Sequence, residues 1–450
     1  MFKRLINPIC GNKFIFKSDV YSVKLFTTNV VVINSYKALQ EAMITRGSDF
    51  ADRPQNFTTA RIITDYKDIT FQNYTDQLKR HRKILQTAMR ANGTKGWQKL
   101  ISKEIDKFLE SLSRKAGTLF DIDHSLTVTS FNVVCDMVIG RTFTENDMEF
   151  NNFQDATREV TMCLLATNVV AYYDYVPWVK VFMRSKLQYM KDVSDRRYRF
   201  LESELEHHIA TFDREKPRDM IDMILIERED SDMKADDMYS NAHIIQSLID
   251  LLSAGVETAI SATKWLLIEL IHHPDIQAKI HQELDEVIGG DRLPVYSDRQ
   301  NLPYVEAAIY EALRIHSTVP LGVFRCTARD TSLGGHDIPT NTIVIPNHWA
   351  IDHDEKVFED PYSFNPQRFI DPKTGLLVSY NNMNFAPFSM GRRVCLGEVF
   401  GRMKYFLIVS NILHQFEFVV PPGVEKPSRE GILGLTYHPK PFEVMVKKRK

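Results

Sequence analysis

The sequence lacks the cysteine pattern of a secreted or zinc-stabilised protein. It has five cysteines, an odd number, and they are widely scattered without a Cys-x-x-Cys pair. We therefore expect neither a disulfide framework nor a structural zinc site, and we expect a reducing compartment. Cys135 and Cys163 stand in apolar runs, which favours small core residues.

Long apolar runs and a basic excess are also missing. No uncharged apolar stretch reaches about 18 residues, so the sequence predicts neither a transmembrane helix nor a signal peptide. The formal net charge is -2, whereas a nucleic-acid partner usually requires a clear basic excess. Binding to DNA or RNA is not expected.

What is present is an ordinary globular composition, with 44% hydrophobic and 25% charged residues in a chain of 450. Length alone suggests about three domains. No Ser/Gly-rich linker, repeat or low-complexity tract divides the chain, so we expect one large domain. Periodicity predicts a mainly α protein with a minor β-sheet lobe, an α+β fold, with helices at 97–112, 131–139, 200–212, 278–288 and 401–416. Short β-branched segments predict strands at 21–25, 29–33, 332–345 and 442–446.

One predicted helix, at 243–273, is apolar nearly all round and would be roughly 45 Å long. Such a helix should run through the core, because charged residues such as Asp250 and Lys264 interrupt it too often for a bilayer span. At its middle stands Ala254-Gly255-Val256-Glu257-Thr258. Glycine inside a helix costs about 1 kcal/mol, so Gly255 indicates a packing or ligand reason.

A second informative stretch, Phe388-Ser-Met-Gly391-Arg-Arg393-Val-Cys395-Leu-Gly397, surrounds one cysteine with glycines and arginines. A thiolate needs backbone N–H groups and positive charge nearby, and we expect Arg393 to supply that charge. Gly391 and Gly397 allow the backbone to fold closely around the sulfur. A lone cysteine is more often an inert core residue, but this context favours a thiolate that holds haem iron, a ligand that promotes O–O cleavage.

The stretch matches Phe-x-x-Gly-x-Arg-x-Cys-x-Gly at every fixed position and so resembles the haem signature of the cytochrome P-450 family. Upstream, Glu311-Ala-Leu-Arg314 is similar to the family's Glu-x-x-Arg, and Asn365-Pro-Gln-Arg368-Phe is similar to its Pro-x-Arg-Phe segment. Glu311 and Arg314 share a helix face and could both bind Arg368 in a structural network. The resemblance implies the family's fold, with haem b between the long helix and the cysteine loop.

The resemblance also assigns cofactor-binding residues. Cys395 would be the axial iron ligand, and three arginines would pair with the haem propionates, because buried carboxylates require cations. The expected cofactor-binding residues are Arg82, Arg325, Arg393, Cys395, Phe388 and Gly391. Leu78 stands where the family has a tryptophan, so one propionate donor is expected to be missing.

The segment from Ala254 to Thr258 resembles the family's oxygen-activation motif, which makes Glu257 and Thr258 the expected catalytic residues. Thr258 would donate a hydrogen bond to dioxygen, and Glu257 with water would supply protons. The resemblance thus implies a monooxygenase that inserts one atom of O2 into a lipophilic molecule of xenobiotic, steroid or fatty-acid type. Two alternatives stay open: a haem-thiolate isomerase or dehydratase that uses a preformed peroxide, and a non-enzymatic haem-binding or sensing protein.

An electron donor would dock near the iron by electrostatic steering. We expect residues 79–83, Arg392, Arg402 and Lys404 to form one positive surface there. The resemblance implies a separate NADPH-dependent reductase, because the chain has no Gly-x-Gly-x-x-Gly nucleotide fingerprint.

The body of the chain, 19–450, resembles the microsomal branch of the family, whereas segment 1–18 does not resemble that branch's anchor. Association with the endoplasmic reticulum on its cytoplasmic face, peripheral membrane contact, a cytoplasmic location and a truncated gene model therefore stay open. Substrate contacts are implied at 56–71, 153–173, 317–323, 431–435 and the long helix. Val319, Leu321, Val323 and Leu435 predict a largely apolar pocket, which selects weakly and leaves the substrate unnamed.

Overall fold

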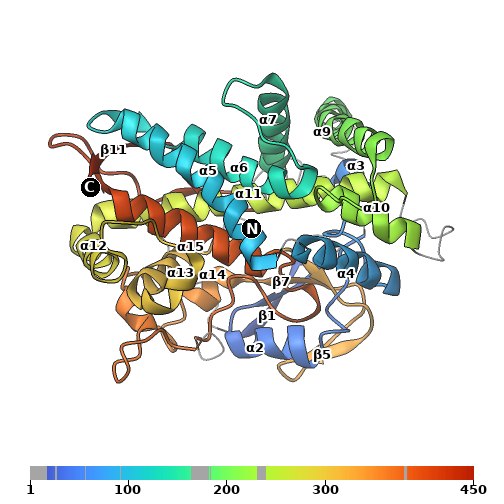
Figure 1. The fold of residues 1–450 in the computed structure, drawn as a ribbon. Coiled ribbons are helices and arrows are strands. Elements are labelled where there is room, and N and C mark those ends of the chain that lie inside the picture. The colour runs from blue at the N-terminus through green and yellow to red at the C-terminus, as the bar shows by residue number, and fades with distance from the viewer. Residues whose placement is uncertain are drawn as a thin grey trace.

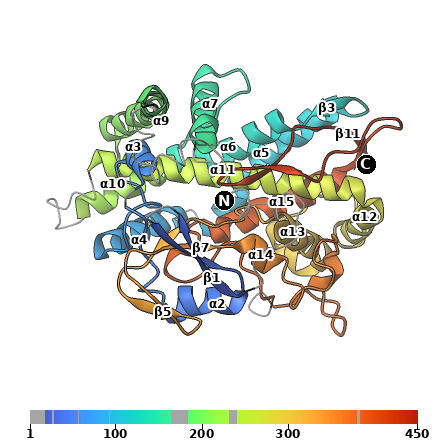
Figure 2. The same ribbon diagram turned by 180° about the vertical axis from the view of Figure 1, so that it is seen from behind.

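The computed structural model describes residues 18–25, 28–55, 57–91, 93–163, 182, 184–230, 240–379 and 383–449. The expected segment 1–18, except Ser18, and residues 164–173 of an expected substrate segment lie outside this part. A mass of helices lies on one side of the molecule and a smaller lobe of strands on the other (Figures 1 and 2). The expected mainly α fold with a minor sheet is confirmed.

The helices cover most of the described chain. Their bounds are α2 (Tyr36–Gln40), α3 (Thr58–Thr64), α4 (Asp76–Arg90), α5 (Gly93–Lys115), α6 (Asp123–Ile139), α7 (Met148–Cys163), α9 (Arg184–Thr211), α10 (Met220–Asp230), α11 (Asn241–His272), α12 (Pro274–Ile288), α13 (Pro303–His316), α14 (His348–Asp352) and α15 (Glu398–Gln415). Short helical turns occur at Glu41–Thr45, Tyr296–Asn301, Pro366–Phe369 and Gly391–Arg393.

The main sheet has the strand order β1-β2-β7-β4. Strands β1 (Val20–Leu25) and β2 (Thr28–Ile33) form an antiparallel hairpin, β2 pairs in parallel with β7 (Ile343–Pro346), and β7 pairs antiparallel with β4 (Arg325–Cys326). Val31 of β2 therefore stands opposite Val344 of β7. This pairing fixes β4, and with it Arg325, relative to the N-terminal hairpin.

Three smaller sheets complete the strands. Their members are β3 (Leu119–Asp121), β11 (Glu443–Lys448) and β8 (Phe416–Val419); β9 (Gly431–Leu433) and β10 (Tyr437–Pro439); and β5 (Thr331–Leu333) and β6 (His336–Ile338). The ranges expected from sequence at 332–345 and 442–446 fall on these strands and on β7.

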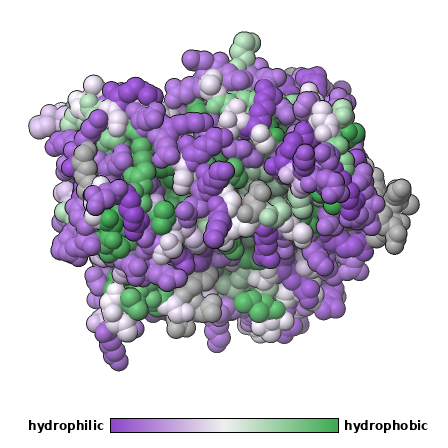
Figure 3. Space-filling model, viewed as in Figure 1, coloured by the Kyte–Doolittle hydropathy of each residue, from purple (hydrophilic) through white to green (hydrophobic). Residues whose placement is uncertain are grey.

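Helix α11 runs through the molecule above α15, behind α5 and α6 in Figure 1 and in front of them in Figure 2. Its side chains are buried from His243 to Ile249 and again from Ile260 to Ile271, as its apolar sequence predicts. Among the described helices, α11 alone has the length and hydropathy of a possible membrane span, and 56% of its most apolar window is buried inside the fold. On the face drawn in Figure 3, hydrophobic side chains lie in small groups among hydrophilic ones.

Candidate active site

The cysteine loop, which runs from Phe388 to Gly397, is held in one conformation by Gly391. Gly391 has a φ of 73°, and a Cβ at this position would lie 1.9 Å from the carbonyl oxygen of Met43. Only glycine fits both conditions. The N–H of Cys395 then donates to the carbonyl oxygen of Phe388 at 3.0 Å, which closes the loop just before α15 begins.

Cys395 is solvent-accessible, although protein lies around the residue on most sides. Burial raises the pKa of the Cys395 thiol, while the N–H of Gly397 and the guanidinium of Arg82 act in the opposite direction. Arg82 reaches the loop itself, because its Nη2 donates to the carbonyl oxygen of Val394 at 2.7 Å.

The expectation that Arg393 supplies charge to the sulfur is wrong. Its guanidinium points the other way and donates to the carbonyl oxygens of Ala51 at 2.8 Å, Ile69 at 3.3 Å and Gln72. Three backbone acceptors on one segment hold the side chain there, and the segment 51–72 is thereby fixed against the cysteine loop. The positive charge that lowers the pKa of the Cys395 thiol is that of Arg82.

Four arginines nevertheless lie together: Arg53, Arg325 and Arg393 are buried, and Arg82 is half-buried. Burial, together with the charge of neighbouring arginines, lowers the pKa of Arg325 to about 9 and that of Arg393 to about 10. Arg325 has a buried Nε without a hydrogen-bond partner, and its Nη2 has only a distant contact, 3.5 Å from Ser389 Oγ. A buried, mutually repelling group of guanidinium ions with an orphan donor fits a ligand that carries negative charge.

Sequence reasoning missed Arg53 because no motif contains it. The side chain is 5% exposed and donates to the carbonyl oxygens of Thr70, Val323 and Phe324 at 2.7, 2.8 and 2.6 Å. Arg325, Arg393 and Arg82 all lower its pKa, so it belongs to the same group. The only available signal was an arginine shortly after two apolar residues, Phe50 and Ala51, and directly before Pro54.

At the middle of α11, one turn is accessible although the helix is buried on both sides of it. Ala254 is exposed, and Glu257, Thr258 and Ala259 are half-buried. Thr258 Oγ1 donates to the carbonyl oxygen of Ala254 at 2.8 Å. The hydroxyl therefore lies on the accessible side, where the sequence expects the oxygen-handling site.

The sequence indicates a packing or ligand reason for Gly255, the glycine of this turn. A Cβ at Gly255 would lie 3.3 Å from Cγ2 of Val134 on α6, which supports the packing reason. The absence of a side chain permits close packing of α6 against α11, and Ala254 rather than Gly255 marks the accessible face.

Glu257 lies among charged side chains. Its Oε2 is 3.7 Å from Nε2 of His438 on β10, and burial raises the pKa of its carboxyl. Asp123 accepts from Lys264 Nζ at 2.6 Å and from Arg158 at 3.1 Å in the same cluster. The Arg158 side chain is 61% exposed, so this cluster joins the middle of α11 to the protein surface.

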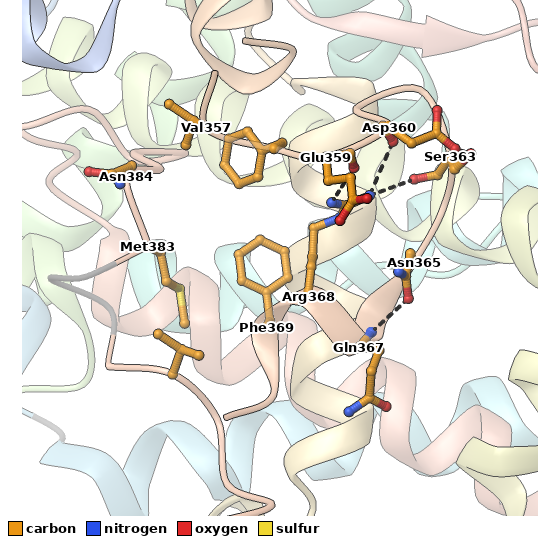
Figure 4. A pocket seen from close by; sticks show the side chains of 12 residues that line it. Val357, Glu359, Asp360, Ser363, Asn365, Gln367, Arg368, Phe369, Met383 and Asn384 are labelled. Carbon is orange, nitrogen blue, oxygen red and sulfur yellow. Dashed lines mark hydrogen bonds between the residues drawn. The ribbon is translucent and has the colours of Figure 1, made fainter. Parts of the chain in front are cut away.

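The Glu-x-x-Arg network forms as expected. Glu311 and Arg314 are fully buried and paired through two contacts of 2.8 Å, and Arg368 Nε donates to Glu311 at 2.9 Å. Arg314 and Arg368 also bind backbone carbonyls between 352 and 363. Arg368 lines a hollow of about 630 Å³ (Figure 4), and none of its lining residues belongs to the cysteine loop. The network therefore fixes loops rather than reactants.

The expected positive surface is partly confirmed. Lys79, Arg80, Lys83 and Arg392 are exposed, and the ring of Tyr74 lies under both Lys79 and Arg392. Lys404 does not belong to this surface, because it is 1% exposed inside α15. Arg402 is largely covered, with cation–π contacts at 5.5 Å to Phe388 and Tyr310.

These features fit haem. Cys395 offers an accessible sulfur, the four arginines offer buried positive charge for two propionates, and the turn at Ala254 offers an opening in the core helix. Leu78 is fully buried and apolar, so position 78 supplies no side-chain donor. The assignment of each residue to the cofactor stays a prediction.

Comparisons with known proteins agree with this geometry. The family model described as cytochrome P-450 matches residues 12–446. The steroid 17-alpha-hydroxylase/17,20 lyase of Squalus acanthias is 32% identical over 438 residues, covering 96% of this chain and 85% of the relative. Cytochrome P-450 2U1 of Bos taurus is 32% identical over 440 residues, covering 96% and 79%.

A solved structure titled as a zebra fish cytochrome P-450 with progesterone superposes with a TM-score of 0.86, at 28% identity, over 99% of this chain and 98% of that one. The resemblance therefore extends from the sequence motifs to the whole fold. The chain belongs to the cytochrome P-450 family and is a haem-thiolate monooxygenase whose cofactor is haem b.

Proposed function

We propose that this monooxygenase hydroxylates a rigid lipophilic substrate of the steroid class. The similarity to steroid 17-alpha-hydroxylases over 96% of the chain supports this class most directly. The half-buried apolar side chains of Val319, Leu321, Val323 and Leu435 agree with it, because a lipophilic molecule requires an apolar lining.

Each part of the site has a proposed role. Haem supplies dioxygen activation, with Cys395 as its ligand and Arg53, Arg82, Arg325 and Arg393 as partners of its propionates. Thr258 presents its hydroxyl on the accessible turn of α11. Glu257 holds a proton to a higher pH than a free carboxyl does, and His438 and Arg158 connect it to the surface.

The acid and alcohol of α11 also favour a monooxygenase over an isomerase or dehydratase. Those reactions start from a preformed peroxide and need no proton delivery. In this chain Glu257 and Thr258 are adjacent, and one belongs to a charged cluster while the other lies on the accessible turn. This arrangement would have no use in an enzyme that receives the O–O bond already formed.

Electrons would come from a separate NADPH-dependent flavoprotein reductase. The exposed cations Lys79, Arg80, Lys83 and Arg392 lie over α4 and the cysteine loop and would attract an acidic donor. Such a donor implies a location at the cytoplasmic face of the endoplasmic reticulum, with peripheral membrane contact.

The test combines the carbon-monoxide spectrum of the reduced protein with 18O labelling of the product. The reduced protein with carbon monoxide should give the red-shifted Soret band of a thiolate ligand, and Cys395→Ala should abolish that band. With reductase, NADPH and 18O2, progesterone should give a product that carries one 18O atom. A histidine-type spectrum would contradict the haem-thiolate site. A normal spectrum with labelled products from fatty acids but none from a steroid panel would contradict the substrate class alone.

A further inference from the structure

Lys404 is a buried cation without an acidic partner. It is 1% exposed, and its Nζ donates to Ser130 Oγ and to the carbonyl oxygen of Gly255, both at 2.8 Å. The carbonyl oxygen of Ser130 lies at 3.4 Å. No ion pair among the described residues includes Lys404, so its neighbours are neutral acceptors only.

A buried amine in this position costs folding free energy, because the amine is removed from water. The flanking residues Met403, Tyr405 and Phe406 are buried, and burial lowers the pKa of Lys404 to about 7. A methionine would fill a similar volume without removing an amine from water. The groups that the amine binds should therefore explain why a lysine stands at this buried position.

What it binds is the accessible turn of α11. Gly255 lies between Ala254, which faces the site, and Glu257 and Thr258, which carry its chemistry. Helix α15, on which Lys404 stands, begins at Glu398, directly after the cysteine loop. Ser130 belongs to α6, which packs so closely on Gly255 that a Cβ there would lie 3.3 Å from Val134 Cγ2. The Lys404 amine thus joins α15, the helix that follows the thiolate loop, to both α11 and α6.

We propose that Lys404 is a positioning residue for oxygen activation, which holds the Ala254–Thr258 turn in register with the cysteine loop through the Gly255 carbonyl. The proposal rests on the proposed roles of Thr258 and Glu257 on that turn. When the amine is absent, the turn loosens, the Thr258 hydroxyl is less well placed, and reduced oxygen leaves as hydrogen peroxide instead of entering substrate.

The chain offers a matched control on the next residue. The hydroxyl of Tyr405 donates to the carbonyl oxygen of Ala262 at 2.8 Å, so the same pair of helices has a second side-chain contact that reaches a different turn of α11. Tyr405→Phe removes one contact between α15 and α11 but leaves the Gly255 turn bound. Lys404→Met removes the contact to Gly255 and keeps the core filled.

The first measurement is amide hydrogen exchange of the haem-loaded protein, which needs neither substrate nor an electron donor. In Lys404→Met we expect exchange in peptides covering 252–260 to accelerate about threefold or more. In Tyr405→Phe any change should fall at 260–266 instead. Unchanged exchange at 252–260 in Lys404→Met, or the same acceleration there in Tyr405→Phe, would overturn the proposal.

The second measurement is peroxide released per NADPH oxidised, in variants that keep the thiolate spectrum. It should rise about threefold or more in Lys404→Met and stay at the wild-type level in Tyr405→Phe. Lys404→Gln, which keeps a donor, should release an amount of peroxide between those of Lys404→Met and the wild type.

The melting temperature separates a positioning role from a structural one. Because methionine replaces a buried amine that is costly to remove from water, Lys404→Met should keep or raise the melting temperature. A lower melting temperature with unchanged peroxide release would show a purely structural lysine. A wild-type protein without a thiolate spectrum would instead refute the haem-thiolate site and leave the exchange result to judge Lys404.

Discussion

Glu257 and His438 face each other across 3.7 Å, from the middle of α11 and from strand β10. Burial raises the pKa of the Glu257 carboxyl and lowers the pKa of His438 to about 4, so near neutral pH the imidazole is uncharged. His438 also contacts the hydroxyl of Thr436. A neutral imidazole can both accept and donate a proton, so under the proposed role of Glu257 this pair would give it a route for reprotonation beside Asp123, Lys264 and Arg158.

The yield of product per NADPH should depend on pH through Glu257. Because its pKa is raised, the carboxyl keeps its proton to a higher pH than a free glutamic acid, and it loses that proton as pH rises through the raised value. We expect the yield to fall with rising pH in the wild type and to be low and flat in Glu257→Gln. The measurement is product per NADPH from about pH 5 to about pH 9. Glu430→Gln, at an exposed ion pair, is the control. An identical pH profile in Glu257→Gln would show that another group supplies the proton.

Removal of the Thr258 hydroxyl should separate NADPH oxidation from product formation. We expect Thr258→Ala to keep consuming NADPH while product per NADPH falls roughly tenfold and peroxide rises. Thr263→Ala is the matched control, since Thr263 makes the same 2.8 Å contact to the carbonyl four residues earlier but is buried. If Thr258→Ala formed as much product per NADPH as the wild type, the proposed role of the hydroxyl would be contradicted.

The buried arginines should control haem retention. Arg53→Met and Arg325→Met each remove one cation from the group that would bind the propionates, so we expect a lower haem content and faster transfer of haem to an acceptor such as apomyoglobin. Arg329→Met, at a side chain that is 68% exposed, should retain haem as the wild type does. If both buried variants held haem as tightly as the wild type, the propionates would have other partners.

The Glu311 network should contribute strongly to stability. Glu311→Ala leaves Arg314 fully buried without its carboxylate, and loss of one member of a buried ion pair typically costs 3–5 kcal/mol, so we expect about that loss in the free energy of unfolding. Chemical denaturation of the purified variant measures it. Glu417→Ala, at a half-buried position outside the network, provides the comparison. Equal stability of both variants would mean that the loops of 352–368 are held by other contacts.

Stability should rise with pH above neutrality because of Lys404. Its folded pKa is about 7, while an unfolded lysine titrates near pH 10.4, so between these values the unfolded state binds more protons. The free energy of unfolding should therefore increase by roughly 4 kcal/mol from neutral pH to about pH 10 from this group alone. Lys404→Met should remove that part of the slope. Parallel pH profiles of the two proteins would contradict a buried, deprotonating lysine.

The sequence predicted the parts of the site that carry dense local patterns. The long helix was expected at 243–273 and lies at Asn241–His272, because an all-round apolar run has few other structures available. The cysteine loop and the Glu311 network were also expected, since several fixed residues at fixed spacing specify them. Helix α9 begins at Arg184, well before the expected start at residue 200, because its first turns are polar and show little apolar periodicity.

The errors come from side chains whose direction depends on tertiary packing. Helix α15 is buried on nearly all sides, so its sequence has no polar stripe to indicate which face Lys404 occupies. Arg393 was assigned to the sulfur by proximity in the chain, but carbonyls far away in sequence bind it. Gly255 contacts Val134 of another helix, a neighbour that no local pattern reveals.

The four interior arginines also bear on how much of this enzyme a cell can maintain. Concentrated positive charge inside the fold destabilises the folded chain until an anionic ligand neutralises it. If the arginines bind the propionates as proposed, haem would stabilise the fold as well as take part in the reaction. A ligand at 100 times its dissociation constant adds about 2.7 kcal/mol to folding. Chains made faster than haem becomes available would then be the ones that proteases remove, and haem synthesis, rather than transcription alone, would set the abundance of the enzyme.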